Sequence, residues 1–494
     1  MSGSRPIRRR FSRAAALLAG VSISLWLRAA AAQETLGLEK AINSALRQNR
    51  RLRVAELALS SAEVAADEAR GAFAPVVTPK GDVRSYSEGD VATYGFGAAL
   101  KTTWGTEWSG ETEWSRQDFG GSADTRRGAV RVEVSQPMLR RLGPLVNREP
   151  VVQAESRVAA ARRELEMEKT DLVVEVAGLF EETLLLQQQV RYEEQAQARL
   201  RNLVRLTEAR LKQGRATRVD LLRVEQQAGE SVVRLSQSHE RLAAVRADLA
   251  DAMGMPPDSR FVVEPAAPPD LKIPPADAAA RIALSNRLDF AQAEQDLADA
   301  RRGVRIARRN RLPDLSLLSR AERFGTGGSY SDAGALDEDA WFVGLAAETD
   351  FPRREERLAE RQAGISASVA EENLEMLKSG IQRQVMQATL AYERARSDVQ
   401  SAERNFRVAE RRATLARRLY EIGRGDNFGV SDAEDALLQA RNQMLGTQSQ
   451  VSVAAYRLLR ALGTLLEYPE ELKPSPPGDG QRSQRGLPTS TAGC

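Results

Sequence analysis

The sequence VVQAESRVAAARRELEMEKTDLVVEVAGLFEETLLL, residues 151–186, carries an aliphatic residue at every seventh position. These positions are Val151, Val158, Leu165, Leu172, Leu179 and Leu186. A sustained repeat of seven is typical of coiled coils, because such residues lie along one side of a helix. The helical pattern extends from Glu149 to Lys212, which predicts a helix of roughly 95 Å at 1.5 Å per residue. Helices in ordinary globular domains are much shorter.

A second long helix is predicted from Arg354 to Ile422, where apolar residues alternate by four and three. Each long helix ends at a glycine turn, QGRA at 213–216 and IGRG at 422–425. Glycine commonly stops helices. Shorter helical stretches flank the long ones, at 36–72, 218–252, 276–310 and 430–462. Each is about half as long, so we expect two of them to stack end to end beside each long helix.

Each half of the chain also contains alternating residues between its first short helix and its long helix. Residues 130–134 read VRVEV, and residues 341–347 read WFVGLAA. Strands of about ten residues with one apolar face fit a membrane β-barrel, and a soluble β-sandwich would show the same alternation. Pro137 and Pro352 close the two strand regions, because proline cannot donate a ladder hydrogen bond.

The first half has more of this alternating sequence than the second. Aromatic residues alternate with small or polar ones from Tyr94 to Trp104, and Trp108, Thr112 and Trp114 continue the pattern. The stretch around Trp108 and Trp114 is either a further hairpin or a longer loop. The sequence therefore leaves open whether the chain has four or six strands.

The chain thus divides into two copies of one plan, each a helix, strands, a long helix, a turn and a helix. The copies span residues 33–252 and 276–467, and a proline-rich linker, 253–275, joins them. The tail 468–494 is rich in Pro, Gly and Ser, and we expect it to be disordered. Residues 1–32 have a basic segment, an apolar segment and a small-residue cleavage site, the order of a secretion signal.

Charge and composition exclude several classes of protein. The net charge is +3, and removing the six arginines of residues 1–32 gives 3 − 6 = −3, so nothing favours a nucleic-acid partner. The single histidine, His239, and the single cysteine, Cys494, exclude a His/Cys metal cluster and a disulfide framework. No apolar run after the signal is long enough for a spanning helix. We expect no enzyme activity, metal or cofactor. The run Arg8-Arg9-Arg10 leaves Sec and twin-arginine export both open.

Four short motifs follow one another at characteristic spacings. They are SQPMLRRLG at 135–143; WFVGL at 341–345 with Phe351-Pro352; Leu390-Ala391-Tyr392, with Phe180 in the comparable place of the first copy; and RLKQG at 210–214 with Asp220-Leu221-Leu222. Together they resemble the TolC-like outer membrane efflux family over nearly all of residues 34–467. The resemblance implies a mainly α fold with β strands, the TolC-like α/β-barrel. In it, a coiled-coil helical tunnel joins an antiparallel β-barrel that a trimer shares in the outer membrane.

The resemblance also implies a function and partners. The homotrimer would be the exit duct of a tripartite efflux or type I secretion system, embedded in outer membrane lipid with its tunnel projecting into the periplasm. It would conduct passively and open at its periplasmic tip by helix untwisting. A periplasmic adaptor and an inner-membrane pump would supply the energy, since the chain has no P-loop motif. The cargo, whether drug, solute or protein, stays open.

The tip would lie at Gly214, Gly423 and Gly425, where the resemblance implies adaptor contact. Asp220 matches the acidic gate residue of the family, and Tyr420 matches its iris tyrosine. The family's arginine falls at Gly425 in this chain, with Arg424 one residue away. We therefore expect a salt bridge between Asp220 and Arg424. Tyr420 is also the last residue of the heptad seam, so its role is either a gate contact or core packing.

Asp432 and Asp435 resemble the pair of aspartates that rings the tunnel entrance in the family. Two carboxylates at i and i+3 share a helix face, and three chains would gather six of them. Such a ring would favour cations. Alternatively, both residues are acids of a helix first turn that interact with the helix dipole.

The arginines at 301, 302, 305, 308, 309 and 311 form either a solvated helix face or a phosphate- or lipid-binding surface near the inner leaflet. Two other classes of protein compete with the duct. A structural coiled-coil protein of the envelope would explain the long helices but not the aromatic strands. A secreted hydrolase would lack a His-dependent triad, since His239 lies within a helix.

Overall fold

The computed structural model describes residues 34–86, 89–119, 124–265, 267, 269 and 271–466. The expected signal at 1–32 and tail at 468–494 lie outside these residues. The described chain forms two compact units. Unit 1 comprises the described parts of Met1–Arg50, Asp171–Lys272 and Ala388–Leu458, and unit 2 those of Arg51–Thr170, Ile273–Gln387 and Leu459–Cys494.

The two long helices are confirmed. Helix α5 spans Glu149–Lys212, with 64 residues, and α10 spans Arg354–Glu421, with 68 residues. The heptad positions explain both, since Leu165, Leu172 and Leu186 of α5 are buried, as are Tyr392 and seven other seam residues of α10. The buried seam residues of α10 are Ile381, Val385, Tyr392, Ala395, Ala402, Ala409, Ala413 and Tyr420 together with the partly buried Phe406.

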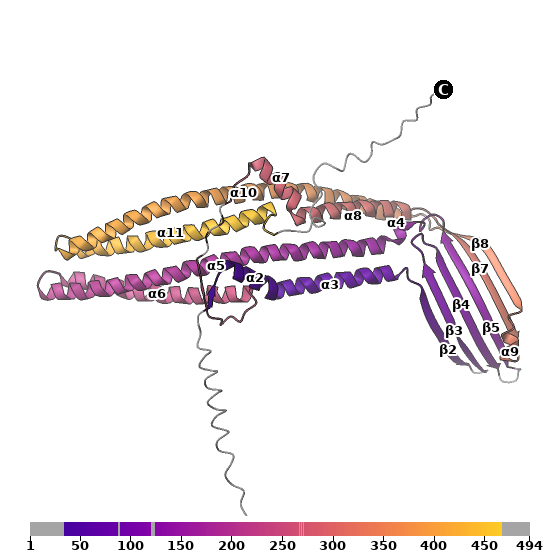
Figure 1. Ribbon diagram of the computed structural model, residues 1–494. Coiled ribbons are helices and arrows are strands. Elements are labelled where there is room, and N and C mark those ends of the chain that lie inside the picture. The colour runs from indigo at the N-terminus through magenta and orange to yellow at the C-terminus, as the bar shows by residue number, and fades with distance from the viewer. Residues whose placement is uncertain are drawn as a thin grey trace, which may run out of the picture. The chain divides into compact units, whose positions relative to one another are not determined.

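Shorter helices pack on the long ones within unit 1. Helix α6, Arg218–Ala252, contacts α5 through Leu242, which clusters with Leu186 and Val190. Helix α11, Asn427–Leu462, contacts α10 through alanines and Leu437, and Figure 1 shows the two helices side by side. Helix α11 begins three residues before the expected Val430.

The opening helices of the two copies are each broken, so the prediction of single helices at 36–72 and 276–310 was wrong. The first consists of α2, Leu38–Gln48, and α3, Arg50–Gly71; the second of α7, Ala276–Asn286, and α8, Leu288–Asn310. Asn49 and Arg287 at the breaks have extended backbone, with ψ of 132° and 125°. The Asn49 side chain donates to the Ala252 carbonyl at 2.9 Å, which satisfies a backbone oxygen at the end of α6.

A short parallel strand pair was also missed. Strand β1, Glu34–Leu36, pairs with β6, Phe261–Val263, inside the stretch predicted to be a linker. The Gln187 side chain of α5 bonds both the amide and the carbonyl of Val263, each at 3.2 Å. Three residues per strand give too little alternation to recognise, and the pairing depends on residues far apart in the sequence.

Unit 2 contains one six-stranded antiparallel sheet in the order β2-β3-β4-β5-β7-β8. Figure 1 shows the strands side by side. Their bounds are Val76–Tyr86, Gly89–Lys101, Glu107–Phe119, Thr125–Pro137, Asp314–Gly327 and Glu338–Glu348. The stretch with Trp108 and Trp114 is β4, so it belongs to a further hairpin, and the open choice between four and six strands is decided in favour of six.

The sheet has one apolar and one charged face, which accounts for the alternation in the sequence. Leu100, Trp108 and Val134 are directly opposite one another on adjacent strands of the apolar face. On the other face, Arg131 contacts Glu111 at 3.4 Å and Glu322 at 3.3 Å. Further ion pairs on this face are Lys80–Glu111 at 2.5 Å, Arg127–Glu322 at 3.0 Å and Arg320–Glu133 at 2.7 Å.

A glycine allows one of these ion pairs to reach across a strand. Lys80 lies on β2 and Glu111 on β4, so the lysine must pass over β3. It crosses at Gly97, where an added Cβ would lie 3.2 Å from the Lys80 Cε. Because Gly97 has no side chain, the charged face continues across β3. Among the described helices, none is both long and apolar enough to cross a membrane.

Replacing Asn49 with alanine should lower the free energy of unfolding by about 1–3 kcal/mol, because the buried Ala252 carbonyl loses its donor. The measurement is the thermal denaturation midpoint. Asn202→Ala on the exposed surface of α5 is the matched control and should change stability by less than about 0.5 kcal/mol. Equal midpoints for the two variants would contradict the proposed contribution of Asn49.

Candidate functional site

The candidate gate lies in unit 1, where two helical turns join α5 to α6 and α10 to α11. Gly214 and Gly423 have left-handed backbone, with φ of +68° and +78°, and therefore end α5 and α10 as the sequence predicted. Gly425 serves a different purpose. An added Cβ there would lie 2.9 Å from the Tyr420 amide nitrogen, so glycine permits the turn to fold closely against the end of α10.

Tyr420 connects α10 to α5. Its side chain is buried, and its hydroxyl lies 3.1 Å from the Thr207 Oγ1. The Arg210 guanidinium stacks 3.9 Å from the centre of the tyrosine ring and donates to the carbonyls of Tyr420 and Glu421. Tyr420 also packs in a small hydrophobic cluster, so it is both the last seam residue and a polar contact.

Thr207 and Arg210 were not identified from the sequence. They lie three residues apart on α5, one turn before Gly214, and so share the helix face that meets Tyr420. The motif RLKQG begins with Arg210, but only the packing of α10 against α5 shows what this arginine contacts.

Asp220 and Arg424 do not form the expected ion pair within the described chain. Asp220 and Thr217 instead form a capping box at the start of α6, in which the Thr217 amide donates to the Asp220 carboxylate at 2.9 Å. The hydrogen bonds from Thr217 lower the pKa of Asp220. Arg424 is exposed in the turn after Gly423.

The starts of α6 and α11 are tied to each other by side chains. The Asn427 side chain, which is buried, donates to the Asp220 carbonyl at 3.1 Å. One turn further along, the Ser431 hydroxyl donates to the Gln227 side chain. Thus α11 contacts α6 in the same region where α10 contacts α5.

Asp432 and Asp435 lie on α11 beyond its first turn, because the helix begins at Asn427. The alternative that they are first-turn acids therefore does not hold. Asp432 pairs with Arg412 of α10, whereas Asp435 approaches Arg234 of α6 only to 4.0 Å.

Burial is the main cause that raises the pKa of Asp435. Arg234 opposes this shift, and the neighbouring carboxylates of Glu230, Asp432 and Glu434 add to it. Burial and the neighbouring carboxylates therefore both disfavour the charged form of Asp435.

Glu434, between the two aspartates, faces the protein interior. Only 9% of its side chain is exposed, and it pairs with Arg199 of α5 at 2.8 Å and Arg417 of α10 at 3.1 Å. In the sequence Glu434 is an acid among acids, and only the helix packing separates its role from those of Asp432 and Asp435. Glu434 links α11 to both long helices.

The second half of the chain matches a known protein family. Residues 279–464 match the family of outer membrane efflux proteins. The pyoverdine export outer membrane protein OpmQ of Pseudomonas putida is 29% identical over 319 residues, which cover 61% of this chain. The chain spans about two thirds, 64%, of the length of that relative.

Two solved outer membrane proteins share the fold. The outer-membrane channel OprN matches with a TM-score of 0.68 and 20% identity, over 86% of this chain and 90% of that one. The outer membrane protein VceC of Vibrio cholerae matches with a TM-score of 0.66 and 17% identity, over 86% of this chain and 96% of that one. The resemblance to the TolC-like outer membrane efflux family is confirmed. The matched family and both solved structures are outer membrane proteins.

Asp435→Asn should alter the pH dependence of the stability of this protein. Because the folded pKa of Asp435 is raised, the charged form is penalised, and the wild type loses stability as the pH rises from the ordinary value of 3.8 through the folded pKa. The variant has no such loss. Its denaturation midpoint should therefore rise relative to that of the wild type as the pH increases from about 3 to about 8.

Asp432→Asn is the control, since it removes the ion pair with Arg412 and should lower stability at about pH 8. A loss of stability in Asp435→Asn at every pH would contradict the burial penalty.

Proposed function

We propose that this protein is the outer-membrane exit duct of a tripartite efflux or type I secretion system. One observation carries the proposal: the six-stranded sheet has an apolar face, a charged face and two exposed edge strands. Every residue of edge strand β2 is exposed, and so is nearly all of edge strand β8. Unpaired edges attract further strands, and a membrane tolerates them only when a barrel closes.

Three copies would close the barrel by pairing β8 of one chain with β2 of the next. Six strands from each of three chains give 3 × 6 = 18 strands. Barrels of about 16–18 strands leave an aqueous channel. The apolar face would contact lipid, and the charged face would line the channel, which is the usual arrangement in outer-membrane barrels.

The long helices of the three copies would line a tunnel in the periplasm through which cargo moves passively. Contacts of Gly214, Gly423 and Gly425 with a periplasmic adaptor would couple the tip to an inner-membrane pump. Untwisting of α10 from α5 would break the contacts of Tyr420 with Thr207 and Arg210, and so open the tip. Arg424 and the Asp220 end of α6 would then meet neighbouring chains rather than each other.

Asp432 and Asp435 from three copies would form the acidic entrance ring, which favours cations. The relative OpmQ is named for pyoverdine export, which supports a small secreted molecule as cargo. A purely structural coiled-coil protein of the envelope would require neither the apolar sheet face nor the two exposed edge strands.

An arginine on the apolar face should block assembly, and one on the charged face should not. Val343→Arg places a charge toward lipid at an exposed position of β8, at a cost of about 2–4 kcal/mol near the bilayer midplane. Ala340→Arg, on the other face of the same strand and opposite Glu322, is the matched control. The measurement is the yield of folded trimer from outer membranes. Equal yields would refute the orientation of the sheet.

Tyr420→Phe should increase the equilibrium constant for opening of the tip about fivefold, because the closed state loses the hydroxyl contact with Thr207, worth about 1 kcal/mol. Conductance of the purified protein in a planar bilayer measures the opening. Tyr392→Phe is the control, since this buried tyrosine uses its hydroxyl to bond the Leu271 amide and the Pro269 carbonyl. Identical conductance of the two variants would show that Tyr420 is not a gate residue. The absence of conductance in the wild type would refute the duct.

A further inference from the structure

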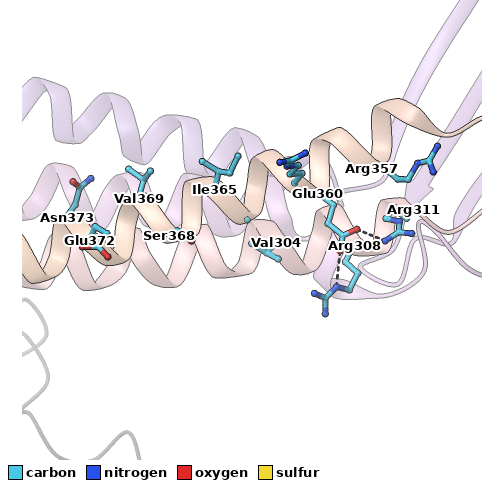
Figure 2. A pocket seen from close by; sticks show the side chains of 12 residues that line it. Val304, Arg308, Arg311, Arg357, Glu360, Ile365, Ser368, Val369, Glu372 and Asn373 are labelled. Atoms are coloured by element: carbon cyan, nitrogen blue, oxygen red, sulfur yellow. Dashed lines mark hydrogen bonds and ion pairs between the residues drawn. The ribbon is translucent and has the colours of Figure 1, made fainter.

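Helices α8 and α10 line an open groove in unit 2, with a volume of about 920 Å³. Its two ends differ in chemistry, as Figure 2 shows. Arg308, Arg311 and Arg357 lie at the end nearer the sheet, and Arg361 joins them in the lining. The walls further along are formed by Val304, Ile365 and Val369.

The arginine end of the groove has an excess of positive charge. Glu360 bonds Arg308 at 3.3 Å and Arg311 at 2.7 Å, as the dashed lines in Figure 2 indicate. With Glu372 as the other acid of the lining, four arginines and two glutamates leave 4 − 2 = +2. Among the described residues, Arg361 forms no ion pair, and Arg357 donates only to the backbone carbonyls of Pro352 and Arg353.

Both helices meet the sheet next to this cluster. Helix α8 ends at Asn310, four residues before β7 begins, and α10 begins at Arg354, six residues after β8 ends. Exposed apolar residues surround the junction: Phe351 is 85% exposed, Leu358 53% and Leu312 39%. Aromatic residues and snorkelling arginines at the ends of spanning segments are typical of the membrane–water interface.

We propose that this cluster binds the phosphodiester headgroup of an anionic phospholipid in the periplasmic leaflet of the outer membrane. The inference rests on the proposed function, because it requires the sheet to span that membrane. Guanidinium groups bind phosphate oxygens by charge-assisted, often bidentate hydrogen bonds, and Arg308, Arg311 and Arg361 have donors left for this role. Phe351 and Leu358 would enter the acyl region beside the bound headgroup.

Charge favours a lipid over a second copy of the chain as the occupant. A neighbouring helix would have to bring carboxylates to this end of the groove to compensate the net +2 of its lining. A phosphodiester supplies negative charge without burying the groove, and it is present wherever the sheet meets the leaflet.

The test is lipid binding by the purified full-length trimer, measured by native mass spectrometry. The double variant Arg308→Gln, Arg361→Gln is compared with Arg394→Gln, Arg404→Gln, which removes two exposed arginines of α10 far along the helix. We expect phosphatidylglycerol to bind more tightly than phosphatidylcholine. Each arginine should contribute about fivefold to the affinity for phosphatidylglycerol. The first variant should therefore bind this lipid about 25-fold more weakly, and the control variant should bind it as the wild type does.

Equal binding of the two lipids, equal binding by the two variants, or displacement of phosphatidylglycerol by an equal concentration of inorganic phosphate would overturn the proposal. So would a cross-link between two copies of the Arg361→Cys variant, because it would show that a second chain covers the groove. Conductance tests the duct independently of the lipid site. The variant Arg308→Gln, Arg361→Gln should conduct as the wild type does, although it binds less lipid. Lipid binding without any wild-type conductance would refute the duct and leave the site intact.

Discussion

The sheet cannot satisfy its own edges, and the rest of the architecture depends on this constraint. Strands β2 and β8 each present a row of backbone groups that no other described strand pairs with. One face of the sheet is apolar and is therefore suited to lipid, where unpaired backbone groups cost several kcal/mol each. In the duct that we propose, a barrel closed by further copies satisfies both conditions. The charged face would then line the pore, and ion pairs such as that of Arg131 with Glu322 would neutralise its charges.

The contacts that join α10 to α5 at the tip are of moderate strength. The cation–π contact of Arg210 with Tyr420 and the hydroxyl contact with Thr207 are each worth about 0.5–2 kcal/mol. Asp220 contributes its charge to the helix cap of α6 rather than to the expected salt bridge with Arg424. In the gate that we propose, contacts of this size would hold the tip closed and an adaptor could break them.

The sequence predicted those parts of the fold that depend on local pattern. Heptads located α5 and α10 to within one residue, and Gly214 and Gly423 marked their ends. The breaks at Asn49 and Arg287 were not predictable, because Asn49 gains its partner, the Ala252 carbonyl, only in the folded chain. For the same reason the site was predicted in part. Periodicity identified Tyr420, while its partners required the registration of one long helix against the other.

The arginine run after residue 300 shows how one sequence feature can serve two purposes. Arg302 is engaged, bonding Glu149 at 2.8 Å and Asp299 at 2.7 Å, and Arg301 pairs with Glu371. These residues join α8 to α5 and α10. Towards the sheet, Arg308 and Arg311 share the single acid Glu360, so charge is left over. A helix that only needed solubility would balance its charges along its whole length. The excess on α8 lies where the helix approaches the strands, and there, in the site that we propose, a membrane would supply the missing anions.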